Sequence, residues 1–132
     1  MPEPIHQEIA VNASPERVYR ALTDAKQFGE LTGAPAEIAP EAGGTFSCFG
    51  GAIVGRNLEL VPNQRLVQAW RVTAWPPGVY SIVKFELQPE GSGTRVVLDH
   101  SAFPEDQRAH LDPGWHTNYW EPLKKHLEGQ PA

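Results

Sequence analysis

Residues 101–127 read SAFPEDQRAHLDPGWHTNYWEPLKKHL, and this stretch decides the fold that the sequence predicts. Its large apolar residues recur at every fourth position, which places them on one stripe of a helix: Trp115, Tyr119, Leu123 and Leu127. Such a stripe needs an apolar surface to lie against, so we expect the helix to pack on the preceding part of the chain. Pro122 lies inside the pattern and removes a backbone donor, so we expect a kink or a break near Glu121.

The chain before this helix mostly alternates between apolar and polar residues, as half-buried strands do. Ile5–Val11 is the first such segment, and turn residues such as Gly43-Gly44 and Gly50-Gly51 separate the later ones. The regular spacing of these turns predicts an antiparallel sheet. We expect strands at residues 5–11, 45–49, 52–61, 65–75, 79–87 and 94–101.

Two short helices are expected between the first strand and the rest of the sheet. Ser14-Pro15-Glu16 is a helix start, with serine as the N-cap, proline in the first position and an acid in the first turn. Phe28 and Leu31 lie on the second helix. No repeat or linker interrupts the chain, so we expect one domain over residues 1–132 with an ordered core of about residues 4–128.

The composition limits the classes of function. The formal net charge is −5 and Lys124-Lys125 is the only adjacent basic pair, so we expect no nucleic-acid partner. No stretch approaches the roughly 20 apolar residues that cross a bilayer, and the first residues show no secretory signal. Cys48 is the only cysteine, which is typical of a reducing compartment. We therefore expect a cytoplasmic protein without a metal or another cofactor.

The side chains that the alternation turns toward the long helix could line a cavity for a small apolar ligand. These candidates are Phe28, Leu31, Phe46, Trp70, Trp75, Val83, Phe85, Leu98, His100, Trp115 and Tyr119. The same residues could instead fill a close-packed core. The residue pattern alone leaves both alternatives open.

His100 is the best polar candidate for a function inside the protein. Its charge changes near neutral pH, so it could act as a general acid or base with Tyr119 or Asp99. Asp99 points to the opposite face of the strand, so we favour a structural histidine and name no catalytic residue. Three residues near the start of the long helix match no metal-ligand spacing, and we expect them to be solvated: His110, Asp112 and His116.

An ordered set of short motifs resembles the START-like (SRPBCC) superfamily. Within that superfamily the chain is similar to the C-terminal domain of the activator of heat-shock protein 90 ATPase. The matching motifs cover nearly the whole chain: Ser14-Pro15-Glu16, Ala34-Pro35-Ala36, Gly43-Gly44-Thr45-Phe46, Gly55, Leu60-Val61-Pro62, Trp70-Arg71, Trp75-Pro76-Pro77-Gly78, and Gly114-Trp115 followed by Tyr119. The resemblance implies an α+β helix-grip fold, a curved antiparallel sheet of about six or seven strands around a long C-terminal helix, with two short helices.

The superfamily includes binders of lipids, hormones and polyketides, cyclases and chaperone modules, so the fold does not decide the function. We expect a non-enzymatic protein that binds a small hydrophobic molecule between sheet and helix, in a stress response. The alternative is a chaperone cofactor that docks on a heat-shock protein 90 type chaperone, and a cyclase or hydrolase ranks third. We expect no counterpart of the activator's N-terminal domain, which would count against a full co-chaperone. We expect a monomer or a homodimer.

Overall fold

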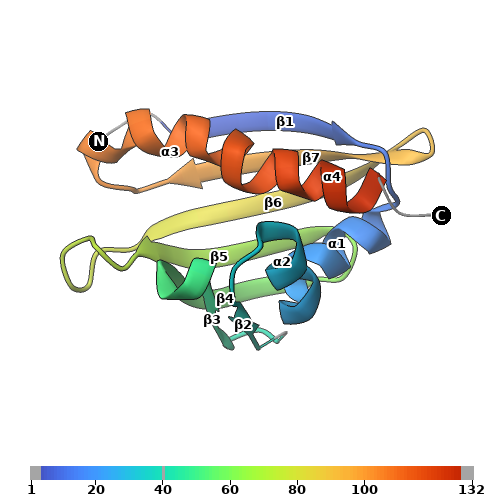
Figure 1. Ribbon diagram of the computed structural model, residues 1–132. Coiled ribbons are helices and arrows are strands. Elements are labelled where there is room, and N and C mark those ends of the chain that lie inside the picture. Colours follow the sequence, from blue (N-terminus) through green and yellow to red (C-terminus); the bar gives the residue numbers. More distant parts are fainter. Residues whose placement is uncertain (1–3, 40, 129–132) are drawn as a thin grey trace.

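A computed structural model describes residues 4–39 and 41–128 of the chain. One antiparallel sheet has the strand order β1-β7-β6-β5-β4-β3-β2, and it curves around a long C-terminal helix (Figure 1). The strands are β1 (Ile5–Val11), β2 (Glu37–Ile38), β3 (Thr45–Cys48), β4 (Ile53–Val61), β5 (Arg65–Val72), β6 (Ser81–Glu90) and β7 (Gly93–Ser101). The predicted α+β helix-grip architecture is therefore confirmed.

The C-terminal helix is continuous but not regular. It consists of a 3-10 turn (Glu105–Gln107), α3 (Arg108–Trp115), a π-helical segment (His116–Trp120) and α4 (Glu121–Glu128). Of the predicted kink or break near Glu121, the break does not occur, because the Glu121 N–H bonds the His116 carbonyl five residues back and the helix continues. The helix does depart from regular α geometry there, through the π-helical segment that directly precedes Glu121. Asp112-Pro113-Gly114 is a sequence typical of a local helix restart, but the helix does not restart there, since Pro113 lies inside α3.

The two short helices lie where the sequence predicts them. Ser14 begins α1 (Pro15–Thr23), and its side chain accepts a hydrogen bond from the Arg17 backbone N–H at 3.3 Å. Asp24 ends α1 and caps α2 (Ala25–Thr32) by accepting from the Lys26 N–H. Both helices contact α4, and α1 also contacts β6 and β7; Figure 1 shows them below α4.

The inner face of the sheet carries the core against these helices. Its buried residues on the three central strands are Leu66, Gln68 and Trp70 on β5, Val83, Phe85 and Leu87 on β6, and Val96, Leu98 and His100 on β7. Val72 and Val79, which the alternation places on the same face, are half-buried near the β5–β6 connection. The stripe Trp115, Tyr119, Leu123 and Leu127 is buried on the helix side. The predicted packing of stripe on sheet is confirmed.

The β5–β6 connection is longer than the sequence pattern predicts. β5 ends at Val72 and not at Trp75, and β6 begins at Ser81 and not at Val79. The Arg71 guanidinium donates to the Trp75 carbonyl at 2.7 Å and to the Val79 carbonyl at 3.2 Å. These bonds hold residues 73–80 in a loop. The Trp75 and Val79 carbonyls accept from the Arg71 side chain, and not from the backbone of a neighbouring strand.

Candidate functional site

A groove of about 260 Å³ opens between α3 and the ends of β4 and β5. Its lining is Phe49, Ala52, Ile53, Trp70, Val72, His110, Leu111, Gly114, Trp115, Asn118 and Tyr119. Most of these side chains are apolar, and among the lining residues only His110 can carry a charge. The groove is therefore suited to an uncharged group.

Three large rings form the floor of the groove. Trp115 and Tyr119 lie one helical turn apart, with ring centroids 4.2 Å from each other, and Trp70 approaches Trp115 from the sheet at 5.7 Å. The Trp70 indole N–H donates to the Tyr119 hydroxyl at 3.5 Å, the outer limit of a hydrogen bond. Burial raises the pKa of Tyr119, so its hydroxyl stays protonated. The floor is apolar with one weakly held hydroxyl.

The rim of the groove is polar and partly open. His110 and Asn118 are exposed, and Gly114 lies between them without a side chain. A Cβ added at Gly114 would meet only the Asn118 Nδ2 at 3.6 Å, an ordinary contact. Glycine is therefore not required here by packing, and its effect is to leave the groove open.

His100 lies in a chain of hydrogen bonds below this floor. The Trp115 Nε1–H donates to His100 Nδ1 at 3.1 Å, and His100 Nε2 lies 2.7 Å from the Ser81 hydroxyl. That hydroxyl donates to the Trp70 carbonyl at 2.8 Å, so the ring must donate from Nε2. His100 is 0% exposed, and burial lowers its pKa from 6.5 to about 3. Both ring nitrogens are occupied in the neutral form, which fits a structural histidine.

The partners proposed for a catalytic histidine do not approach His100. Asp99 points to the outer face of the sheet, where it lies 2.7 Å from His6 Nδ1. Tyr119 is bonded to Trp70 and not to the histidine. The arrangement therefore offers no general base beside a free nucleophile.

Gln7 is a buried polar residue that the sequence analysis did not single out. Its side-chain amide donates to the Asp112 carboxylate at 2.6 Å and accepts from the Trp120 Nε1–H at 2.7 Å. Asp112, expected to be solvated, is thus half-buried and bonded, whereas His110 and His116 are exposed. A polar residue at an inward position of an apolar alternation was the signal that could have identified Gln7.

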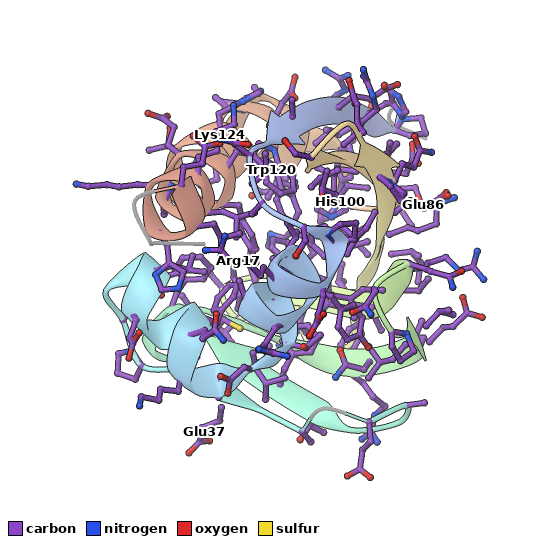
Figure 2. All side chains as sticks on the ribbon, turned by 90° about the vertical axis from the view of Figure 1, so that its right-hand side faces the viewer. Arg17, Glu37, Glu86, His100, Trp120 and Lys124 are labelled. Atoms are coloured by element: carbon purple, nitrogen blue, oxygen red, sulfur yellow. The ribbon has the colours of Figure 1, made fainter. Side chains whose placement is uncertain are left out.

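The candidate cavity residues are distributed over several places. Trp70, Trp115 and Tyr119 line the groove. Phe28, Phe46 and Phe85 surround a gap of about 10 Å³ beneath Tyr119, which is at the limit of what one water needs. Trp75, Val83, Leu98 and His100 are buried and line neither space, and Leu31 is half-buried beside α4. Figure 2 shows His100 and Trp120 inside the protein, between helix and sheet.

Among the described residues, no three His, Cys, Asp or Glu side chains come close enough to hold a metal ion. Trp75 Nε1 is the one buried side-chain nitrogen or oxygen in residues 4–39 and 41–128 that has no partner, and its ring packs edge-on to Trp70 at 5.9 Å. No helix in the part of the chain that the structure describes is long and apolar enough to cross a membrane.

Comparisons with known proteins agree on one family. The chain is 28% identical to the human activator of 90 kDa heat shock protein ATPase homolog 1 over 112 residues, which is 85% of this chain and 33% of that protein. It spans about a third of the length of the curated relatives that it matches.

Two of the solved structures that resemble this chain share its fold over nearly the whole length of both chains. An HSP90 activator from Plasmodium falciparum has a TM-score of 0.87, 26% identity and 97% coverage of both chains. The Aha1 dimer from Colwellia psychrerythraea has a TM-score of 0.80, 26% identity and 96% coverage of both chains. The profile of the "Activator of Hsp90 ATPase homolog 1-like protein" family matches residues 12–128, and the chain belongs to this family.

Proposed function

We propose that the protein is a cofactor that docks on an Hsp90-type chaperone and changes its ATPase activity. The observation that carries this proposal is the match over 97% of both chains to a structure described as an HSP90 activator. The packed core agrees with a module that acts through its surface, because the gap beneath Tyr119 is only about 10 Å³. We place this action in the cytoplasm, in the stress response, with residues 1–132 acting as one domain.

The test is the ATPase rate of the Hsp90-type chaperone from the same organism as the protein is titrated in. An inhibitor of the chaperone's nucleotide site gives the background rate, and heat-denatured protein is the matched control. We expect a saturable change in rate and a binding isotherm with the same midpoint. If calorimetry detects no complex and the rate stays constant, the proposal is wrong.

The groove supports a second function, the binding of a small hydrophobic ligand. Its volume of about 260 Å³ lies just below the range of about 300–1,000 Å³ that drug-sized ligands occupy, so a ligand with one or two rings fits it best. Trp70, Trp115 and Tyr119 offer ring faces and edges against which such a ligand can pack. The unpartnered indole N–H of Trp75 lies next to this floor.

Native mass spectrometry of gently purified protein, compared with a denatured sample, tests the ligand. Thermal shifts with a panel of uncharged aromatic compounds follow, in wild type and in two variants. Gly114→Leu puts a side chain into the groove and should abolish the shift, while Gly114→Ala leaves room and should keep it. Ligand binding is refuted if native mass spectrometry of the wild type shows no additional mass and no compound shifts its melting temperature.

We also propose a second copy of this chain as a partner. The support is the solved relative from Colwellia psychrerythraea, which is described as a dimer and is covered over 96% of its chain. Sedimentation velocity over a concentration series tests self-association directly. A single monomeric species at every concentration would refute it.

A further inference from the structure

The outer face of the sheet, which the helices do not cover, has two halves of different character. One half is a charged ladder of ion pairs, between and along strands, on β1, β7, β6, β5 and β4. In it Arg95 pairs with Glu8 at 2.9 Å and with Glu90 at 2.8 Å, and Lys84 pairs with Glu86 at 2.9 Å. His6 with Asp99 and Arg65 with Glu59 complete the ladder. Its charges are satisfied within the chain.

The other half of the outer face is a wide hollow of about 960 Å³ over β2, β3, β4 and β5. Small outward side chains form its floor: Thr45, Ser47, Val54 and Ala69. Tyr80 forms one wall and is 49% exposed, and the Arg71 guanidinium stacks on its ring at 5.7 Å. Ile82, which pairs with Ala69 across the strands, is 39% exposed beside it. The surface is mixed, with the hydroxyls of Thr45 and Ser47 beside the apolar side chains of Val54 and Ala69. Its exposed apolar side chains, Tyr80 and Ile82, are of the kind that a partner covers in an interface.

Two opposite charges flank this hollow. Glu37 on β2 is exposed, and Figure 2 shows its side chain pointing away from the helices. Arg56 on β4 is exposed, and its guanidinium donates to the Gly43 carbonyl at 2.8 Å. Within the described residues neither side chain has an ion-pair partner, in contrast to the charged ladder. Both line the hollow.

The strand register gives the distance between the two charges. Glu37 lies opposite Ser47, Thr45 lies opposite Arg56, and these two β3 residues are two positions apart. Glu37 and Arg56 are therefore two strands and two residues apart, roughly 12 Å between Cα atoms. Among the described residues the two side chains form no ion pair with each other, which leaves both charges available to a partner.

We infer that the hollow is where two copies of this chain meet, with Glu37 of each copy facing Arg56 of the other. This inference rests on the proposed self-association and names its surface. A two-fold axis that lies in the interface, midway between the two side chains, exchanges their positions. One chain therefore supplies both halves of two ion pairs, and the floor of small side chains lies between them. A surface with opposite charges at its two ends is complementary to itself.

Charge reversal tests the pairing, because the two single variants are expected to behave differently alone and mixed. Glu37→Arg and Arg56→Glu each place like charges opposite one another in a homodimer, so each should raise the dimer dissociation constant about tenfold or more. An equimolar mixture of the two variants restores both ion pairs and should form a heterodimer with affinity near that of wild type. The double variant, with the charges exchanged, should also recover the dimer.

The measurement is sedimentation velocity, with native mass spectrometry to separate heterodimer from homodimers. Glu105→Arg and Lys125→Glu change the charge equally at exposed sites on the helical side and should leave the dimer unchanged. Thermal unfolding of every variant checks that the fold is intact. A wild type that stays monomeric refutes the inference together with self-association. A wild-type dimer that neither reversal weakens, or variants that do not recover on mixing, refutes this surface alone.

Discussion

The Trp115 indole N–H donates to Nδ1 of His100 at 3.1 Å, and this bond determines the state of the imidazole ring. Because Nδ1 accepts, the ring proton resides on Nε2 and is donated to Ser81. The ring also packs edge-on against Trp70 and Phe103, with centroids at 4.9 and 5.1 Å. His100 thereby connects α3 to three neighbouring strands, and its contribution should be to stability.

Replacing His100 with alanine should destabilise the fold by about 2–4 kcal/mol. The variant removes a buried ring and leaves the Trp115 N–H without an acceptor, and both effects cost free energy. Urea unfolding followed by tryptophan fluorescence gives the difference. His116→Ala, at an exposed position of the same helix, is the control and should change stability by no more than about 0.5 kcal/mol. Equal losses in the two variants would contradict the structural role.

The stability of the protein should fall as the pH drops from 6.5 toward 3. The folded state holds the pKa of His100 at about 3, below its ordinary value of 6.5, because the ring is buried. Between these values the unfolded state binds the proton and the folded state does not, so stability rises with pH and is fully present above 6.5. A single group of this kind contributes a slope of up to about 1.4 kcal/mol per pH unit.

His6 changes the pH dependence of stability in the opposite direction, so its contribution has to be removed before that of His100 can be measured. It is exposed, and hydrogen bonds to Asp99 and Glu8 raise its pKa, so its contribution is present below 6.5 and is lost as the pH rises through the raised value. We therefore compare His6→Gln with the double variant that adds His100→Gln. The double variant should show the flatter pH dependence. Nitrogen NMR of the intact protein should also show His100 neutral and protonated on Nε2 down to about pH 4.

The sequence was sufficient for the sheet and the helix stripe, because alternation and four-residue spacing follow directly from strand and helix geometry. At Pro122 the sequence predicted the place of an irregularity, a kink or a break, but not its form. The chain instead widens into a π turn, in which Glu121 bonds His116, and keeps the stripe facing the sheet. The π turn is favoured because it lets both Tyr119 and Leu123 be buried against the sheet. This contribution comes from packing between helix and sheet, so the residues around Pro122 alone do not reveal it.

The groove was only partly predictable. Trp70, Trp115 and Tyr119 share the inward faces that the patterns define, so they were found. Phe49 and Ile53 were missed, because they flank a turn in which Phe49 has a positive φ of 55°, where the alternation no longer decides which way a side chain points. Packing density was equally invisible, since the same aromatic residues are compatible with a cavity or with the filled space beneath Tyr119.

Gln7 and Trp120 should be energetically coupled. The Gln7 side chain accepts the Trp120 indole N–H at 2.7 Å in the interior, so Gln7→Ala leaves that donor unpaired and should cost about 1–3 kcal/mol. Trp120→Phe removes the donor itself. The double variant should therefore lose less stability than the two single variants lose together. Denaturant unfolding should give a coupling free energy of about 0.5–3 kcal/mol between the two residues. Strict additivity would show that the bond does not form.

Gly55 should tolerate no larger residue, because strand and core both approach it. A Cβ at this position would collide with the Ala69 carbonyl oxygen and would lie 2.6 Å from the Phe46 ring. The first contact is with backbone, which cannot rotate away, so Gly55→Ala should cost about 3 kcal/mol or more. Gly114→Ala is the matched control: its Cβ meets only ordinary contacts in a helix, so stability should stay equal or rise by up to about 1 kcal/mol. Thermal or urea unfolding compares the two variants. A Gly55→Ala protein as stable as wild type would mean that β4 and β5 do not pair in the register in which Gly55 lies opposite Trp70.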